Sequence, residues 1–352
     1  MTAPLLEVEN LQKHFPQFTQ TLIKRKSAPV KAVDGVSFTL QPGETLGLVG
    51  ESGCGKSTAG RTVLRLIEPT GGSIKVNGEE ITHAGASRLR QLRRELQMVF
   101  QDPIGSLNPR HPVGSIIAAP FEIQRVKPAG GVRAEVQRLM ERVGLNPEHY
   151  NRYPHEFSGG QRQRIGIARA VALKPKLIVC DEPVSALDVS IQAQVVNLLE
   201  DLQDEYRIAY VFIAHDLSVV RHISDRVAVM YLGKVMELTD RETLYNAPMH
   251  PYTHSLMSAV PVPEPALKNR RERILLTGDL PSPINPPSGC VFHTRCPKFR
   301  ERLSDVQQAR CTSEVPKLEE KAPAHLVHCH FPEVRRDPGA VAGDRSSPEA
   351  GL

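Results

Sequence analysis

The sequence predicts an α/β fold built on a mostly parallel sheet, with a glycine-rich loop at its centre. Residues 50–58 fit the pattern G-x-x-x-x-G-K-[ST] at every fixed position. A short apolar run, 45–49, precedes this loop, and residues 59–66 can continue from it as a helix, so the loop lies between a strand and a helix. Two further uninterrupted apolar runs, 177–180 and 209–214, are typical of strands that are buried on both faces of a parallel sheet.

The loop has the chemistry of a phosphate cradle. Its glycines let several backbone N–H groups point at phosphate oxygens, and the start of the following helix adds positive partial charge. In this pattern Lys56 reaches the β- and γ-phosphates of a nucleotide and Ser57 ligates Mg²⁺. The predicted nucleotide-binding residues of the loop are Gly50, Glu51, Ser52, Gly53, Cys54, Gly55, Lys56, Ser57 and Thr58.

Composition limits the class of protein. The chain has 352 residues, and its 44 Lys and Arg against 39 Asp and Glu give a net charge of +5, which is too small an excess to argue for nucleic acid. No stretch approaches the roughly eighteen apolar residues of a membrane-spanning helix, and the N-terminus lacks a secretory signal. We therefore expect a soluble, cytoplasmic protein of one to three domains.

The N-terminal region predicts an antiparallel sheet beside the loop. Residues 5–10 and 36–40 alternate apolar and polar side chains, which suits half-buried strands. The basic stretch between them, 14–31, has the composition of a loop, and residues 73–78 predict another strand that an Asn-Gly turn closes. Phe15 lies in the predicted loop, where a phenylalanine is by default a surface or core side chain.

A mainly helical insertion is predicted between about residues 95 and 170. Residues 113–124 have helical character, and the apolar positions from 132 to 143 recur at the spacing of an amphipathic helix. A short strand within the insertion ends in Gln101. A glutamine at that point can reach Mg²⁺ or an attacking water, although a solvated strand end is the better explanation of this residue taken alone.

The segment Ser158-Gly159-Gly160-Gln161 precedes a helix that is predicted to end near residue 173. Two glycines after a serine leave backbone N–H groups bare at a helix start, which makes a second anion site without a lysine. A plain N-cap turn explains the same four residues.

Carboxylates follow the buried strand at 177–180. Open α/β sheets bind their ligands at the carboxyl ends of the strands, so Asp181 is placed to hold Mg²⁺ and Glu182 to polarise a hydrolytic water. His215 stands at the end of the next strand and faces the same crevice, where a histidine can sense a γ-phosphate.

Taken in order, these motifs resemble an ATP-binding cassette (ABC) ATPase, which has a P-loop NTPase (RecA-like) core, an N-terminal antiparallel β subdomain and an inserted α-helical subdomain. The resemblance covers residues 5 to about 250 and is carried by the phosphate loop, Gln101, Ser158 to Gln161, Asp181 and Glu182, Ser185-Ala186-Leu187-Asp188 and His215. It departs from the family at Phe157, where leucine is common. It implies that Phe15 stacks on adenine, that Asp188 lies at the nucleotide, and that Glu182, His215 and Gln101 are catalytic.

The resemblance also implies a head-to-tail dimer in which each ATP lies between the phosphate loop of one subunit and the Ser-Gly-Gly-Gln signature of the other. A solitary chain is then expected to bind ATP and hydrolyse it poorly. The implied partners are two permease subunits, a second homologous ATPase subunit and, indirectly, a substrate-binding protein, with no nucleic acid. The implied location is the cytoplasmic face of the bacterial inner membrane.

Beyond the cassette, the chain resembles the oligopeptide and dipeptide import ATPases, and their "F" subunit in particular. The residues that carry this are the run from His250 to Leu256, Pro281-Ser282-Pro283 and the run from Gly105 to Arg110. The implied domains are a cassette at 1–250, a loop-rich extension at 251–333 and a disordered tail at 334–352. Nickel, glutathione or sugar remain alternative substrates. A soluble ABC ATPase acting on nucleic acid is disfavoured, because such proteins usually carry two cassettes or a long coiled coil.

Four of the six cysteines gather in the last quarter of the chain, at Cys290, Cys296, Cys311 and Cys329. Four thiolates can close a zinc site or hold an iron–sulfur cluster, but the spacing matches neither zinc ribbons nor ferredoxins. Resemblance to the peptide-import ATPases favours [4Fe–4S]. Zinc, or four free buried cysteines, are the other interpretations.

Overall fold

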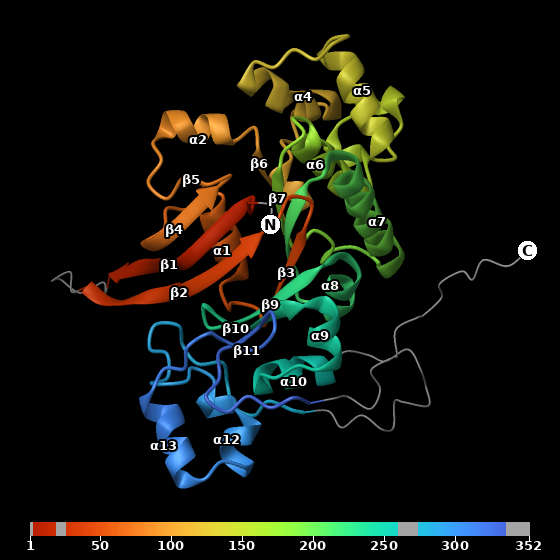
Figure 1. Ribbon diagram of the computed structural model, residues 1–352. Coiled ribbons are helices and arrows are strands. Elements are labelled where there is room, and N and C mark those ends of the chain that lie inside the picture. The colour runs from red at the N-terminus through yellow and green to blue at the C-terminus, as the bar shows by residue number, and fades with distance from the viewer. Residues whose placement is uncertain (1–2, 19–25, 260–273, 336–352) are drawn as a thin grey trace, which may run out of the picture.

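The computed structural model describes residues 3–18, 26–259 and 274–335, and it contains two sheets (Figure 1). The strands are β1 (Leu6–Phe18), β2 (Lys26–Leu40), β3 (Thr45–Val49), β4 (Gly71–Val76), β5 (Glu79–Glu80), β6 (Leu96–Val99), β7 (Leu177–Asp181), β8 (Ala209–Ile213), β9 (Arg226–Tyr231), β10 (Lys234–Asp240), β11 (Glu319–Ala322) and β12 (His325–Val327). The smaller sheet has the order β2-β1-β4-β5 and the larger has the order β11-β12-β10-β9-β3-β8-β7-β6.

The centre of the larger sheet is parallel, as the sequence predicts. Strand β3 pairs in parallel with β8 and β9, and β7 pairs in parallel with β6 and β8. Every residue of β3, β7 and β8 is buried, because these strands are apolar and both faces of the sheet are covered. The carboxyl ends of β3 and β7 therefore open at one edge of the sheet.

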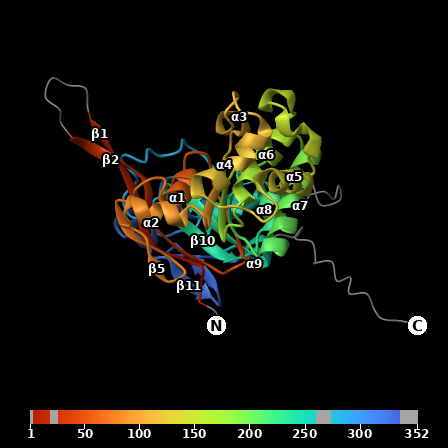
Figure 2. The same ribbon diagram turned by 90° about the horizontal axis from the view of Figure 1, so that it is seen from above.

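Helices surround this sheet. They are α1 (Lys56–Val63), α2 (Ala86–Leu92), α3 (Pro103–Ser106), α4 (Val113–Gln124), α5 (Val132–Arg142), α6 (Gly159–Val171), α7 (Val189–Tyr206), α8 (Leu217–Ile223), α9 (Arg241–Asn246), α10 (Pro251–Ser258), α12 (Pro297–Glu301) and α13 (Asp305–Ser313), with 3-10 turns η1 (Pro147–Asn151), η2 (Pro154–Glu156) and η3 (His293–Arg295). Figure 1 shows α4 and α5 at one end of the molecule and α12 and α13 at the other. Seen from above, α3 to α7 gather on one side and the β1–β2 pair projects on the other (Figure 2).

The predicted helical stretch at 95–170 contains α3 to α6, and the short strand predicted before Gln101 is its first element, β6. Strand β6 pairs in parallel with β7 and is largely buried, so the chain enters the helical part from the sheet. Helices α4 and α5 begin at the predicted positions, Val113 and Val132. The two helices pack on α6 through a shared apolar core.

The prediction of a loop at 14–31 is wrong for the described residues of that stretch. Strand β1 continues to Phe18 and pairs with β2, with His14 opposite Lys31 and Phe15 opposite Val30. The polar composition hid the strands, because an edge ribbon of this kind buries few side chains. Pro16 has no partner in the ladder and lies at a register shift, where its missing N–H costs no bond.

The C-terminal part of the chain continues the larger sheet. Strand β12 pairs antiparallel with β10 and with β11. Glu237 of β10 and His325 of β12 form a fully buried pair, with Nε2 of the histidine 2.6 Å from Oε1 of the glutamate. Of the predicted tail at 334–352, residues 336–352 lie outside the described residues.

Candidate active site

The glycine-rich loop lies between β3 and α1, and its backbone has the conformation of a cradle. Gly50 and Gly55 have φ angles of 150° and 106°, which residues with a Cβ rarely adopt. A Cβ on Gly50 would lie 2.2 Å from the Met230 carbonyl oxygen, and one on Gly55 would lie 2.0 Å from that of Ala32. No side chain caps the start of α1, so its first N–H groups are left for a ligand.

The lysine of the loop is buried against the loop's own backbone. Lys56 Nζ donates to the carbonyl oxygens of Gly50 at 2.7 Å and Glu51 at 3.0 Å. Cys54 is buried beneath the loop, and burial raises the pKa of its thiol. Ser52 and the neighbouring glycine face solvent at the rim.

The two residues predicted to hold Mg²⁺ from different elements meet at the end of β7. Ser57 Oγ donates to Asp181 Oδ1 at 2.6 Å, and Arg61 Nη2 lies 3.2 Å from Asp181 Oδ2. A hydroxyl and a carboxylate are oxygen ligands of the kind that Mg²⁺ prefers, so this pair fits the ion. Gln101 is not part of this pair in the structure, because its amide turns to Glu182 instead.

Two of the residues predicted to be catalytic, Gln101 and His215, converge on a carboxylate oxygen of the third, Glu182. Gln101 Nε2 donates to Glu182 Oε2 at 3.0 Å, and His215 Nδ1 lies 3.4 Å from the same atom. Glu182 has a φ of 45°, a conformation that non-glycine residues seldom adopt and that often marks functional sites. Its N–H donates to the Ile213 carbonyl oxygen at 3.0 Å, so β8 fixes this backbone.

The Ser-Gly-Gly-Gln segment forms the first turn of α6. Ser158 Oγ accepts from the Gln161 N–H at 3.3 Å, and the Ser158 N–H donates to Gln161 Oε1 at 3.0 Å. This reciprocal capping box does not use the N–H groups of Gly159 and Gly160. Within the described residues, no hydrogen bond or ion pair joins this turn to the glycine-rich loop, so one chain brings the two anion-binding elements into no direct contact.

Two residues predicted to contact the nucleotide, Asp188 and Phe15, are exposed. Asp188 is the N-cap residue of α7, and its side chain makes no capping bond. Phe15 is 36% exposed on β1, with Lys13 Nζ 4.9 Å from its ring centroid. An open ring under a cation is available for stacking, and the adenine-binding role of Phe15 stays a prediction.

Two family models match the chain. The ABC transporter model matches residues 33–185, and the model of the oligopeptide/dipeptide transporter C-terminal region matches residues 236–302. The chain is 57% identical to the oligopeptide transport ATP-binding protein AppF of Bacillus subtilis (strain 168), over 93% of this chain and 97% of that protein. It is 56% identical to OppF of Escherichia coli (strain K12), over 92% of this chain and 95% of that protein.

This chain belongs to the ABC family of oligopeptide transport ATP-binding proteins. The resemblance inferred from the motifs is therefore confirmed, and so is the P-loop NTPase fold. A solved structure of the ATP-binding cassette MJ0796, described as dimeric and bound to ADP and Pi, superposes with a TM-score of 0.60 at 26% identity, covering 67% of this chain and 98% of that one. As in ABC ATPases generally, the nucleotide is ATP with Mg²⁺.

The late cysteines of this ABC protein require a correction. Cys290, Cys296, Cys311 and Cys329 line one small cavity. Among residues 3–18, 26–259 and 274–335, however, no group of three or more His, Cys, Asp or Glu side chains is placed to hold a metal ion, so the predicted [4Fe–4S] or zinc site has no support in this structure. Analysis of iron, acid-labile sulfide and zinc in anaerobically purified protein tests this correction.

Three residues at this ABC site escaped the sequence reasoning. Arg61 follows Ser57 by four positions on α1, a spacing that places both on one helix face and could have identified the arginine. Tyr252 and Arg295 contact the loop from the C-terminal region, and no local sequence pattern predicts either contact. In the described part of the chain, no helix is long and apolar enough to cross a membrane.

Proposed function

We propose that this ABC protein is the ATP-hydrolysing subunit of an importer that takes up di- and oligopeptides through separate permease subunits. The convergence of Gln101 and His215 on Glu182, beside the Ser57–Asp181 pair, carries the hydrolytic part of the proposal. The peptide part is supported by relatives with more than half of their residues identical and by the match to the peptide-transporter C-terminal region.

In this proposal Glu182 orients the water that attacks the γ-phosphate. Its carboxylate accepts a bond from Gln101 and faces His215, so both side chains hold it in one orientation. Lys56 neutralises the phosphate charge, and the N–H groups at the start of α1 bind phosphate oxygens. Ser57 and Asp181 would hold Mg²⁺, which supplies charge neutralisation when bound.

A complete site needs a second ATPase subunit in this proposal. The N–H groups of Gly159 and Gly160 remain free at the start of α6, and these two residues are exposed or half-buried. A partner that presents its own glycine-rich loop would cover them. The dimeric cassette MJ0796, with ADP and Pi, supports this arrangement by similarity. The partner that we propose is a homologous subunit, with Asp188 and Phe15 adding contacts to ATP.

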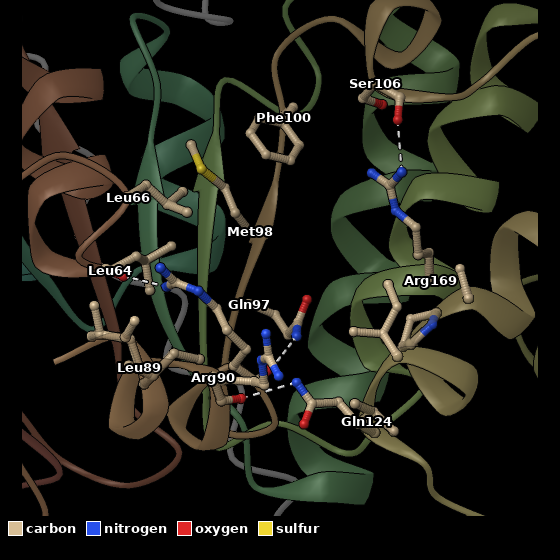
Figure 3. A pocket seen from close by; sticks show the side chains of 17 residues that line it. Leu64, Leu66, Leu89, Arg90, Gln97, Met98, Phe100, Ser106, Gln124 and Arg169 are labelled. Atoms are coloured by element: carbon tan, nitrogen blue, oxygen red, sulfur yellow. Dashed lines mark hydrogen bonds between the residues drawn. The ribbon is translucent and has the colours of Figure 1, made fainter.

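A groove between the sheet and the helical part is the proposed contact with a permease. The cavity measures about 710 Å³ (Figure 3), and three large apolar side chains at its rim, Leu66, Phe100 and Ile123, are 46%, 37% and 70% exposed. Arg169 Nη1 spans one side of the groove to the Ser106 carbonyl oxygen at 2.7 Å. We assign the groove to a short amphipathic helix of the permease, with an apolar face for this rim.

The groove is connected to the catalytic residues through the backbone. Phe100 lines it, and the next residue, Gln101, donates to Glu182. Movement of a permease helix bound in the groove would therefore shift Gln101. In this proposal the protein lies on the cytoplasmic face of the bacterial inner membrane, attached through its permeases. Its proposed domains are a cassette at 1–250 and an extension at 251–333.

The test is Glu182→Gln in the assembled transporter. We expect ATP binding to be retained, and both steady ATP hydrolysis and uptake of labelled peptide to fall at least a hundredfold. Glu200→Gln, which changes a half-buried glutamate on α7, is the matched control and should hydrolyse ATP normally. Retained turnover in Glu182→Gln would reject the assignment of the base. If the transporter takes up nickel, glutathione or sugar but no peptide, the proposed peptide substrate is wrong.

A further inference from the structure

Glu51, the second residue of the glycine-rich loop, is held by two side chains that lie 201 and 244 residues later in the sequence. Its backbone N–H donates to Tyr252 Oη at 3.0 Å, and its Oε2 accepts from Arg295 Nη1 at 2.7 Å. Its carbonyl oxygen accepts from Lys56 Nζ at 3.0 Å. One residue thus links the C-terminal extension to the lysine of the phosphate cradle.

Both side chains from the extension are fixed by their surroundings. Tyr252 is fully buried, with its ring centroid 4.9 Å from that of Tyr231 and 5.3 Å from that of Phe292. The Arg295 guanidinium lies 5.9 Å from the centroid of the Tyr231 ring. Neither side chain can leave Glu51 without disturbing this aromatic cluster.

The contact between Glu51 and Arg295 differs from an ordinary surface ion pair. Their side chains are 28% and 10% exposed, so water and salt screen the charges little. Removing one partner leaves the other charge partly buried and unpaired, which makes the remaining loop conformation less favourable.

Anchoring of Glu51 has a consequence for nucleotide binding. The loop binds phosphate only when its N–H groups and Lys56 are aligned, and the apparent affinity falls in proportion to the fraction of molecules in that conformation. Contacts at the N–H, the carboxylate and the carbonyl oxygen of one residue restrict the loop to a single arrangement.

We propose that Tyr252 and Arg295 are positioning residues that hold Glu51 and thereby raise the affinity of the phosphate loop for ATP. The C-terminal extension then contributes to the ATP site of its own chain. This inference rests on the proposed function, since it concerns the same ATP site. Neither side chain touches a residue that we assign to the hydrolytic step, so the effect falls on binding.

The test measures the Kd for Mg-ATP of the full-length wild type and of Arg295→Met by calorimetric titration. We expect the variant's Kd to rise on the order of tenfold. Arg295→Lys should recover part of the affinity, because it keeps the charge but loses the planar fork. In the assembled transporter the KM for ATP should rise while kcat stays within twofold. Arg302→Met removes another ion pair of the extension, 3.1 Å from Glu333, and should bind ATP as the wild type does.

Two further variants keep the inference testable if Arg295→Met does not fold. Glu51→Gln removes the same ion pair from the loop side, and Tyr252→Phe removes the acceptor of the Glu51 N–H. Combining Glu51→Gln with Arg295→Met should weaken binding no more than the stronger single change, since both remove one contact. Wild-type affinity in the folded single variants would overturn the inference. A wild type that binds no ATP would instead overturn the proposed function.

Discussion

A buried histidine at the start of α10 should make the stability of this protein sensitive to acid. His250 is the N-cap residue of α10, and its Nδ1 accepts from the Tyr252 N–H at 3.0 Å. It is 1% exposed, and burial lowers its pKa from 6.5 to about 3, with His328 and His254 adding repulsion. Glu237 also faces this turn, because its Oε2 accepts from the His250 N–H at 3.0 Å.

The direction in which stability changes with pH follows from proton binding. Below pH 6.5 the unfolded chain protonates this histidine while the folded chain keeps it neutral down to about pH 3, so stability is lost as the pH falls through that window. The loss is about 1.4 kcal/mol per pH unit, or about 2 kcal/mol at pH 5 relative to neutral pH. That is a large part of a typical folding free energy of about 5–15 kcal/mol.

His250→Asn isolates this effect, because asparagine caps a helix well but does not titrate. Urea denaturation of the full-length protein at pH 7.5 and pH 5.0 measures the change in unfolding free energy. We expect the wild type to lose about 2 kcal/mol more than His250→Asn over this range. The exposed His83→Asn serves as the control and should lose as much as the wild type. An equal loss in His250→Asn and wild type would refute the reasoning.

Two further predictions concern the loop and the signature. Gly55→Ala puts a Cβ 2.0 Å from the Ala32 carbonyl oxygen, whereas nothing lies within 4 Å of the Cβ that Gly53→Ala adds. Gly55→Ala should therefore lower the unfolding free energy by several kcal/mol more than Gly53→Ala does. Thermal denaturation of both variants measures this difference. Ser158→Ala removes the acceptor of the Gln161 N–H and should cost about 1 kcal/mol in urea denaturation, whereas equal stability would mean that the capping box contributes nothing.

The parts of the site that the sequence predicted are those that short patterns determine. The loop follows the buried strand β3, and Asp181 and Glu182 lie at the end of the buried strand β7. Because the carboxyl ends of parallel strands meet at one edge of the sheet, the proximity of these residues follows from the fold class. Gln101 and Glu182 were assigned to one catalytic site through the family resemblance, but the hydrogen bond between them, across 81 residues of sequence, was not predicted.

Other features were beyond local patterns. The length of β1 and β2 was missed because an exposed ribbon can be polar along its whole length, and the 14–31 stretch has the composition of a loop. The contacts of Tyr252 and Arg295 with Glu51 depend on how the extension packs against the loop, and no sequence pattern predicts that packing. The cysteines are close together, as expected, yet their placement does not make a metal site.

The extension is part of the folding unit that carries the loop. Glu237, on β10, is fully buried, and its carboxylate accepts from the N–H groups of Met249 and His250 and lies 2.6 Å from His325 Nε2. Removing the extension would take away His325 and leave the buried Glu237 carboxylate with fewer partners, which costs several kcal/mol. It would also uncover Tyr231, whose ring packs against Tyr252 and Phe292. A shortened cassette would therefore lose the anchor of Glu51 together with part of its core. Because both changes lower ATP binding, only single substitutions in the full chain separate the anchoring of the loop from the stability of the fold.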